Sequence, residues 1–458
     1  MPTAELTRFR HDLRRGLGSA LLTLQASASP EQYTDAVRWA CLNVTTYDFQ
    51  SEGSRGWYLH QAATLTGQAP AIESDVRKQF ATSSPDGHRF EQLGGILLHY
   101  ALDGSNTARQ ALWDRYADLM ARLTRTIRRD GWWQAMTTLE GLALDLVAID
   151  GWPAAKTAVL GFGNALALAR PDAEHERWQY FPDWFDSEVK EQFGETDAHQ
   201  NLVGDSSEAA RVYAATAATY RTRPWAAGKK TPVPAPAVTS LKDVVEQARH
   251  GDGTTWSIRS TARKLVRDQN TAHAEAVAHL GMAETDPALK AEILWPFRKW
   301  PFPLPDDTLT DLVDTDHEAL RQIVRSILGQ RVAEWKRSHA LHLLDQDEQP
   351  DEALDLLMAS YQPEDEATVD AAIRRIPLRG NEWHSAFLRL TDLLKPEDRP
   401  VTTSVLAYIY RETLCSNCRV RTVKLMHDKH VLPAEIIEQC RWDSNDHIRD
   451  LAEQWTAG

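Results

Sequence analysis

The chain has 458 residues, of which 42% are hydrophobic and 25% charged, enough for one extended core or two to three globular ones. Acidic residues outnumber basic ones by 65 to 51, and the formal charge of −14 argues against nucleic acid as the main partner. Four cysteines do not make a disulfide framework in a chain of this length, and no signal-peptide pattern or membrane-length apolar run is present. We therefore expect a soluble cytoplasmic protein without a membrane segment.

The first half of the chain carries apolar residues at helical spacing. The pattern predicts helices over 6–24, 33–41, 90–102, 108–129 and 206–221, and another that ends near Gly67. Two blocks, 131–152 and 151–171, are apolar on all sides, which is typical of helices packed on both faces. Strand signals are nearly absent, so we predict an all-α fold.

The segment 224–240, PWAAGKKTPVPAPAVTS, alternates prolines with other residues. This composition favours an extended polyproline conformation without internal hydrogen bonds. We therefore predict a linker there, between an N-terminal helical lobe over 1–223 and a second domain over 241–458. The lobe holds much of the tryptophan of a chain that has 16 such residues.

The second half reads as short, regular helices separated by proline-rich breaks. Ser416-Asn417 and Ser444-Asn445 open two similar phrases, in which Arg421 and Arg449 occupy equivalent places. Ser, Asn and Asp before an apolar run are helix N-cap signals, and Asp286 precedes another such run. The recurrence predicts helix–turn–helix repeats, with the two arginines each bracing the next repeat.

In its caps, its arginine position and its near-constant spacing, the region from about residue 245 to 458 resembles HEAT-type repeats. The resemblance, which extends to armadillo-like variants, implies an α-solenoid with a concave binding face and says nothing of a reaction. It makes a scaffold that binds a protein or peptide the first expectation. An enzyme with a pocket in the N-terminal lobe is the alternative. A HEAT-type DNA glycosylase is a second alternative. Its basic DNA-binding face would come from the runs near Arg263 and Arg375, but acidic residues lie between these runs and weaken the case.

Candidate ligand-binding residues gather in a short glycine-punctuated segment. They are Asp48, Glu52, Arg55, Trp57 and Tyr58, joined by Trp132, Trp133 and Glu140 from the apolar blocks. In the functional interpretation, the segment forms a polar pocket rim whose arginine fork binds a carboxylate or phosphate. In the structural interpretation, Arg55 is held by two acids and only fixes a turn.

Three acids lie in the first apolar block, Glu140, Asp145 and Asp150. A buried carboxyl can have a raised pKa and serve as a general acid or base. Their spacing does not bring them to one helix face. The structural alternative is that Asp145 takes an arginine from a neighbouring helix and that Asp150 ends its helix before Gly151.

Cysteine and histidine cluster near the end of the chain, with Cys415 and Cys418 followed by His427, His430 and Cys440. Such ligands could close a zinc site. However, Cys418 begins the helix that carries His427, and a rise of about 1.5 Å per residue keeps the two more than about 10 Å apart. No P-loop, dinucleotide fingerprint, metalloprotease motif or nucleophile elbow occurs. We therefore expect no stoichiometric zinc and no cofactor.

Overall fold

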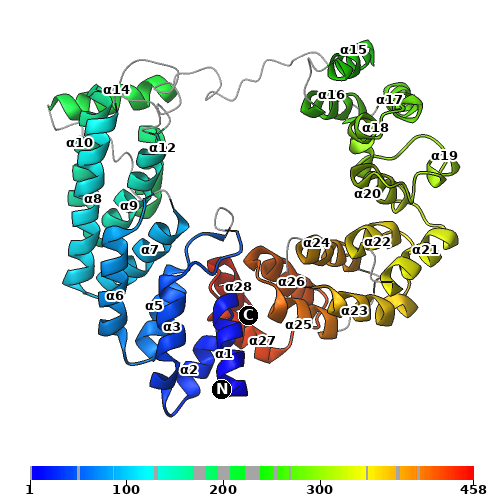
Figure 1. Ribbon diagram of the computed structural model, residues 1–458. Helices are drawn as coiled ribbons and strands as arrows, with labels where there is room; N and C mark the ends of the chain where they lie inside the picture. The colour runs from blue at the N-terminus through cyan, green and yellow to red at the C-terminus, as the bar shows by residue number, and fades with distance from the viewer. Residues whose placement is uncertain are drawn as a thin grey trace. The chain divides into compact units, whose positions relative to one another are not determined.

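The computed structural model describes the chain over 3–48, 52–85, 87–127, 133–168, 181–193, 207–221, 238–250, 255–267, 270–346, 349–377, 382–397, 399 and 403–457. Over these ranges every regular element is a helix and none is a strand (Figure 1), so the all-α prediction is confirmed. A search of the same residues finds no helix with the length and apolar character of a membrane span.

The chain forms two compact units. Unit 1 contains Met1–Lys230, Leu414–Asn417 and Ala434–Gly458, and unit 2 contains Thr231–Thr413 and Cys418–Pro433. This division differs from the predicted domains because the end of the chain returns to the first unit. The predicted linker lies outside the described residues up to its last part, where a helix begins at Val238.

The helices of unit 1 are α1 (Ala4–Arg15), α2 (Gly18–Ala26), α3 (Thr34–Leu42), α5 (Gly56–Leu65), α6 (Ala69–Thr82), α7 (His88–Leu102), α8 (Asn106–Thr126), α9 (Trp133–Asp150), α10 (Trp152–Leu168), α12 (Phe181–Phe193), α14 (Glu208–Arg221), α27 (Ala434–Cys440) and α28 (Asp446–Ala457). Helix α7 packs against α5, α6, α8 and α9. Its Leu93 is fully buried in the core with Leu59, Leu112 and Leu146 from three of these neighbours. The helical spacing of apolar residues thus produces the core that the sequence predicts.

The C-terminal helices belong to unit 1 because of a close backbone contact. The backbone N–H of Ser444 donates to the carbonyl of Gly16, 2.8 Å away, between α1 and α2. A Cβ atom on Gly18 would lie 1.8 Å from the carbonyl oxygen of Gln439 on α27. Glycine at position 18 is therefore needed for α27 to approach α2, and it explains the GLGSA sequence there.

The helices of unit 2 are α15 (Val238–Arg249), α16 (Thr255–Arg267), α17 (Thr271–Ala283), α18 (Pro287–Leu294), α19 (Asp307–Thr310), α20 (Glu318–Leu328), α21 (Glu334–Asp345), α22 (Pro350–Leu357), α23 (Glu366–Arg375), α24 (Glu382–Leu394), α25 (Thr403–Glu412) and α26 (Ser416–Asp428), the last beginning in residues counted with unit 1. Along one series, α16, α18, α20, α22 and α24 each pack on the next, while α21, α23 and α25 do so along another. In both series, each helix packs against the helix two places further along the chain. The two series form two rows within the unit (Figure 1).

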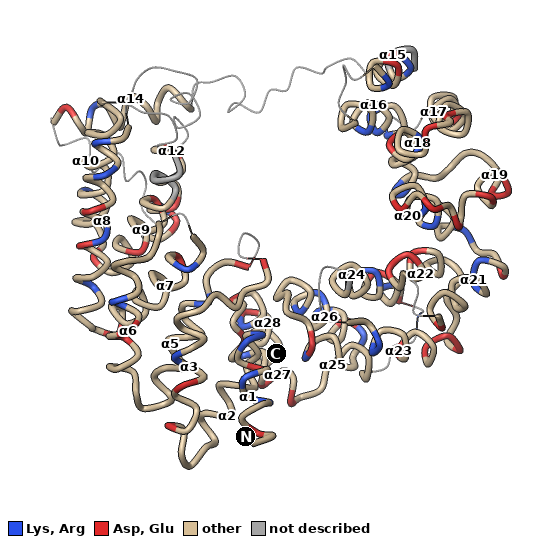
Figure 2. The backbone as a smooth tube through the Cα atoms, viewed as in Figure 1, with Lys and Arg blue, Asp and Glu red and all other residues tan. Residues whose placement is uncertain are grey.

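Ion pairs join alternate helices of unit 2, along which both basic and acidic residues occur (Figure 2). Arg259 on α16 pairs with Glu292 on α18 at 2.8 Å. Arg321 and Arg325 on α20 both pair with Glu352 on α22, each at 3.0 Å. The basic residue Arg259 is thus neutralised within the unit, which weakens the case for a basic nucleic-acid face.

The repeated phrases are only partly equivalent in the structure. Asp286 caps α18 by accepting from two backbone N–H groups, and Asn445 accepts from Ile448 at the start of α28. Arg421, however, is more than half exposed and lies 4.0 Å from Asp392. Arg449 is partly buried and donates to the carbonyl of Asp443 at 2.8 Å. The two arginines therefore have different surroundings, although the sequence assigns them one role.

Candidate functional site

Arg55, the central residue of the predicted site, is held inside unit 1. Its side chain is 2% exposed and pairs with Glu52, itself 1% exposed, at 3.3 Å. It also donates to the Arg14 carbonyl at 2.7 Å and to the Thr45 hydroxyl at 3.3 Å. Glu52 is one of the two acids of the structural interpretation, in which Arg55 fixes the turn.

The other predicted residues divide between core, surface and pocket. Tyr58 is fully buried and donates its hydroxyl to the Leu17 carbonyl at 2.9 Å, so it is a core residue. Asp48 is exposed. Trp132 lies outside the described residues, as does the side chain of Trp133. Trp57, in the first turn of α5, is the aromatic residue of the set that lines a cavity.

This cavity, the unit 1 pocket, has a volume of about 550 Å³. It lies among the turn before α5 and helices α5, α7, α9 and α28, and its ionisable and aromatic lining comprises Glu52, Trp57, Phe90, Glu91, His99, Asp145, Asp446 and Arg449. The size is in the range of small-molecule sites. Gly141 on α9 also lines it, and a Cβ atom built there would meet no atom within 4 Å.

Arg449 is the cation of the pocket. Its guanidinium carbon lies 4.1 Å from the centre of the Trp57 ring, close enough for a cation–π interaction. Trp57 in turn stacks against Trp442, with ring centres 6.3 Å apart. Over the described residues, Arg449 donates to one backbone carbonyl and forms no ion pair with a carboxylate. Burial lowers the pKa of Arg449, whereas neighbouring acids, first Asp446, oppose that shift.

Two carboxyl groups of the pocket also have no ion pair or hydrogen bond within the described part of the chain. Burial raises the pKa of Asp145 on α9 to about 7. Burial also raises the pKa of Glu91 on α7, and the charge of His88 opposes that shift. Among the described residues, Asp145 therefore has no arginine partner of the kind that the structural alternative predicts. Its carboxylate instead lies 4.0 Å from the Cβ position that Gly94 lacks.

His99 adds a neutral imidazole. Burial, helped by the charges of His60 and Arg449 and opposed by that of Asp103, lowers the pKa of His99 to about 4. At neutral pH this ring therefore carries no charge that would neutralise the acids or repel a cation. Near pH 7 the pocket presents the Arg449 cation, a neutral histidine, the carboxyl groups of Glu91 and Asp145 with raised pKa values, and two further carboxyl groups, those of Glu52 and Asp446.

The remaining acids of α9 lie elsewhere. Burial raises the pKa of Glu140 to about 8, and the charge of Glu188 on α12 adds to the shift. Asp150, the last residue of α9, pairs with Arg109 at 2.6 Å and accepts from the Trp113 indole at 2.7 Å. Asp150 is thus the helix-ending residue that the structural alternative predicts, and Glu140 does not line the unit 1 pocket.

All four cysteines are buried. Within unit 2, the thiol of Cys418 at the start of α26 lies 3.3 Å from Nδ1 of His384 on α24. This pair supplies two of the four ligands of a tetrahedral structural site. The sequence singled out Cys418 but not His384, since the residues meet through helix packing rather than spacing. The expectation of no stoichiometric zinc stays a prediction.

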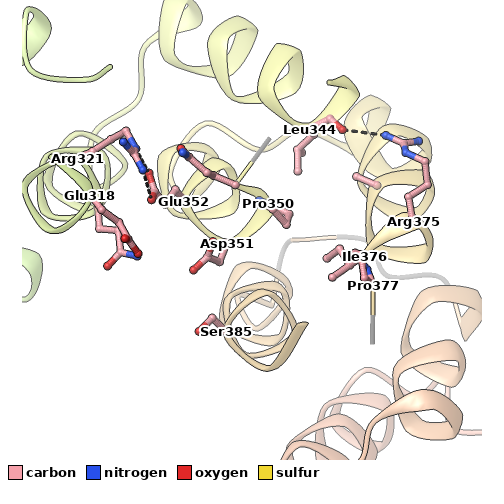
Figure 3. A pocket seen from close by; sticks show the side chains of 13 residues that line it. Glu318, Arg321, Leu344, Pro350, Asp351, Glu352, Arg375, Ile376, Pro377 and Ser385 are labelled. Atoms are coloured by element: carbon pink, nitrogen blue, oxygen red, sulfur yellow. Dashed lines mark hydrogen bonds and ion pairs between the residues drawn. The ribbon is translucent and has the colours of Figure 1, made fainter. Parts of the chain in front are cut away.

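Unit 2 has a cavity of its own, of about 590 Å³, lined from α20, α22, α23 and α24 and their flanks (Figure 3). Its arginines are bonded within the unit: Arg321 pairs with Glu352, and Arg375 donates to the Leu344 carbonyl at 2.8 Å. Glu318 also lines it. The arginines of this cavity are therefore bonded to groups of unit 2 itself, whereas Arg449 in the unit 1 pocket has no carboxylate partner among the described residues.

Comparisons of the chain with protein-family models, with curated proteins and with solved structures give no match.

Proposed function

We propose that the protein is a helical-repeat binding protein whose unit 1 pocket captures a carboxylate carried by a peptide or another small molecule. The observation that carries the proposal is Arg449, a partly buried guanidinium stacked on Trp57 without a carboxylate partner in the described residues. Placing a cation in such a site has a free-energy cost that a bound anion would offset. A guanidinium binds a carboxylate through two parallel hydrogen bonds, which also fixes the ligand's orientation.

We also propose that unit 2 is a HEAT-like α-solenoid that extends the binding surface for a protein or peptide partner. Its support is the near-constant spacing of the helices α18, α20, α22 and α24, which begin at Pro287, Glu318, Pro350 and Glu382. Repeat folds of this kind bind their partners along an extended concave surface. Nucleic acid is not proposed, because the chain is acidic overall.

The test uses two pools of random hexapeptides without Asp or Glu, which differ only in a free or an amidated C-terminus. Both pools are passed over the immobilised full chain, and bound peptides are identified by mass spectrometry. We expect enrichment from the free-carboxylate pool alone and its loss in Arg449→Gln. Arg421→Gln, which changes the exposed arginine of the matching phrase, is the control and retains enrichment. Equal enrichment from both pools, or retention in Arg449→Gln, would contradict the proposal.

An enzyme is the second candidate, and Asp145 favours it. A carboxyl whose pKa lies near 7 is suited to donate or accept a proton at neutral pH. If the pocket catalyses a reaction, an enriched peptide incubated with the protein changes mass. Asp145→Asn then abolishes the mass change while binding persists. An unchanged peptide after prolonged incubation rules out this reaction for that ligand.

A further inference from the structure

The unit 1 pocket is lined by basic and acidic side chains that form no ion pair with one another in the described structure. Arg449 on α28 and Asp145 on α9 line the same cavity but form no ion pair in the described structure. A site that bound only an anion would gain from an apolar lining in place of Asp145 and Glu91, because unpaired carboxylates repel an anion. The carboxyl groups therefore call for a second, cationic group on the ligand.

We infer that the pocket takes a zwitterion, an amino acid or very short peptide whose carboxylate binds Arg449 and whose ammonium binds Asp145. This inference rests on the proposed function, which supplies the carboxylate half. The two charged groups come from different helices, so they can hold opposite ends of one ligand. The volume of about 550 Å³ accommodates a molecule of that size, and Gly141 leaves the α9 wall open beside Asp145.

Binding of an ammonium would displace the proton of Asp145. With its pKa near 7, Asp145 is mostly protonated at pH 6 in the empty pocket. A cation alongside stabilises the carboxylate and lowers that pKa, so the proton leaves on binding. Around Asp145, α7 contributes Glu91 and His99 and α28 contributes Arg449 and Asp446.

The neighbouring helix α12 contributes Glu188, whose charge acts on Glu140 rather than on Asp145. Since His99 titrates near pH 4, it stays neutral over the range in which Asp145 loses its proton. Affinity should consequently rise with pH by up to about tenfold per unit below pH 7 and level off above it.

The experiment compares Leu-Leu with N-acetyl-Leu-Leu, which lacks the ammonium, and with Leu-Leu-amide, which lacks the carboxylate. Isothermal titration of the full chain is expected to give Leu-Leu an affinity at least about tenfold above either analogue. In Asp145→Asn, we expect Leu-Leu and N-acetyl-Leu-Leu to bind equally. At pH 6, titration in phosphate and in Bis-Tris should reveal release of about one proton, which is absent in Asp145→Asn.

The outcomes separate this inference from the proposed function. If N-acetyl-Leu-Leu binds as tightly as Leu-Leu, the inference that the pocket binds a zwitterion is wrong, but the proposed carboxylate site is not contradicted. If Leu-Leu-amide binds as tightly as Leu-Leu, the carboxylate site is wrong. If none of the three binds at millimolar concentration, or if Leu-Leu binds without proton release at pH 6, the inference is overturned.

Discussion

Unit 2 and the unit 1 pocket use arginine differently. In unit 2, Arg321 and Arg325 converge on Glu352, and Arg259 pairs with Glu292, so that charge joins one helix to the next. In the unit 1 pocket, Arg449 lies against an aromatic ring without a carboxylate partner in the described chain. The difference separates arginines that hold a fold together from one that is available to a ligand.

The largest expected effect is on the buried network of unit 2. Glu352→Leu leaves Arg321 and Arg325 without their shared carboxylate and should destabilise the protein by about 3–5 kcal/mol, measured by urea denaturation. Asp370→Ala is the matched control. It removes one partner of the exposed Arg374–Asp370 pair and should cost less than about 1 kcal/mol. Equal costs for the two variants would mean that the helix-to-helix pairs do not hold unit 2 together.

Arg55 should stabilise the fold, as the paired arginines of unit 2 do, although it lies beside the unit 1 pocket. Arg55→Met removes bonds to Glu52, Arg14 and Thr45 and should lower the free energy of unfolding by about 2–4 kcal/mol. Arg449→Gln, which loses one carbonyl bond and a ring contact, should lower it by less than half as much. Denaturation curves that rank the two variants in the opposite order would reverse the assignment of structural and ligand-binding arginine.

The buried acids of α9 should make stability depend on pH. The pKa of Glu140 rises from 4.5 to about 8 and that of Asp145 from 3.8 to about 7, so the native state holds these protons more tightly than the unfolded chain. Stability therefore falls as pH rises from about 4 to about 8. At pH 8.5, Glu140→Gln and Asp145→Asn should each stabilise the protein by about 1–3 kcal/mol, with little effect at pH 4. A gain that does not change with pH would exclude this cause.

The smallest predicted effect is that of Gly141→Ala, which is compared with a change at a second glycine of the pocket lining, Gly56. Gly141→Ala should stabilise α9 by about 0.5–1 kcal/mol, because nothing lies near the added Cβ atom. Gly56→Ala should destabilise by about 1–3 kcal/mol, because its Cβ would lie 2.4 Å from the backbone of Gly95. Melting temperatures that move in the same direction would show that the wall beside Gly141 is not open.

Sequence patterns predict the helices well because apolar spacing is local. Phe90–Leu102 was expected as a helix, and α7 spans His88–Leu102. The patterns also single out Trp57 as a pocket residue. They give Arg55 a possible ligand-binding role, since nothing in its neighbourhood along the chain reveals the distant Arg14 carbonyl that it binds.

The rest of the pocket depends on contacts between residues far apart in the chain. Arg449 stands out in the sequence as a repeat brace, but its stacking on Trp57 requires α28 to return to unit 1. Glu91 and Asp145 belong to ordinary helical patterns, and they become a site only when α7 and α9 line one cavity. The return also depends on Gly18, but the sequence alone does not show that this glycine lies against the backbone of Gln439.

The most direct test of the account is the affinity of one carboxylate-terminated peptide, taken from the selection above, for three forms of the full chain. The account predicts equal dissociation constants for the wild type and Arg421→Gln, and one at least about tenfold weaker, or about 1.4 kcal/mol, for Arg449→Gln. All three should be measured by isothermal titration well below their melting temperatures. Equal affinity in all three forms would contradict the claim that the unpaired arginine of unit 1 is the ligand's anchor.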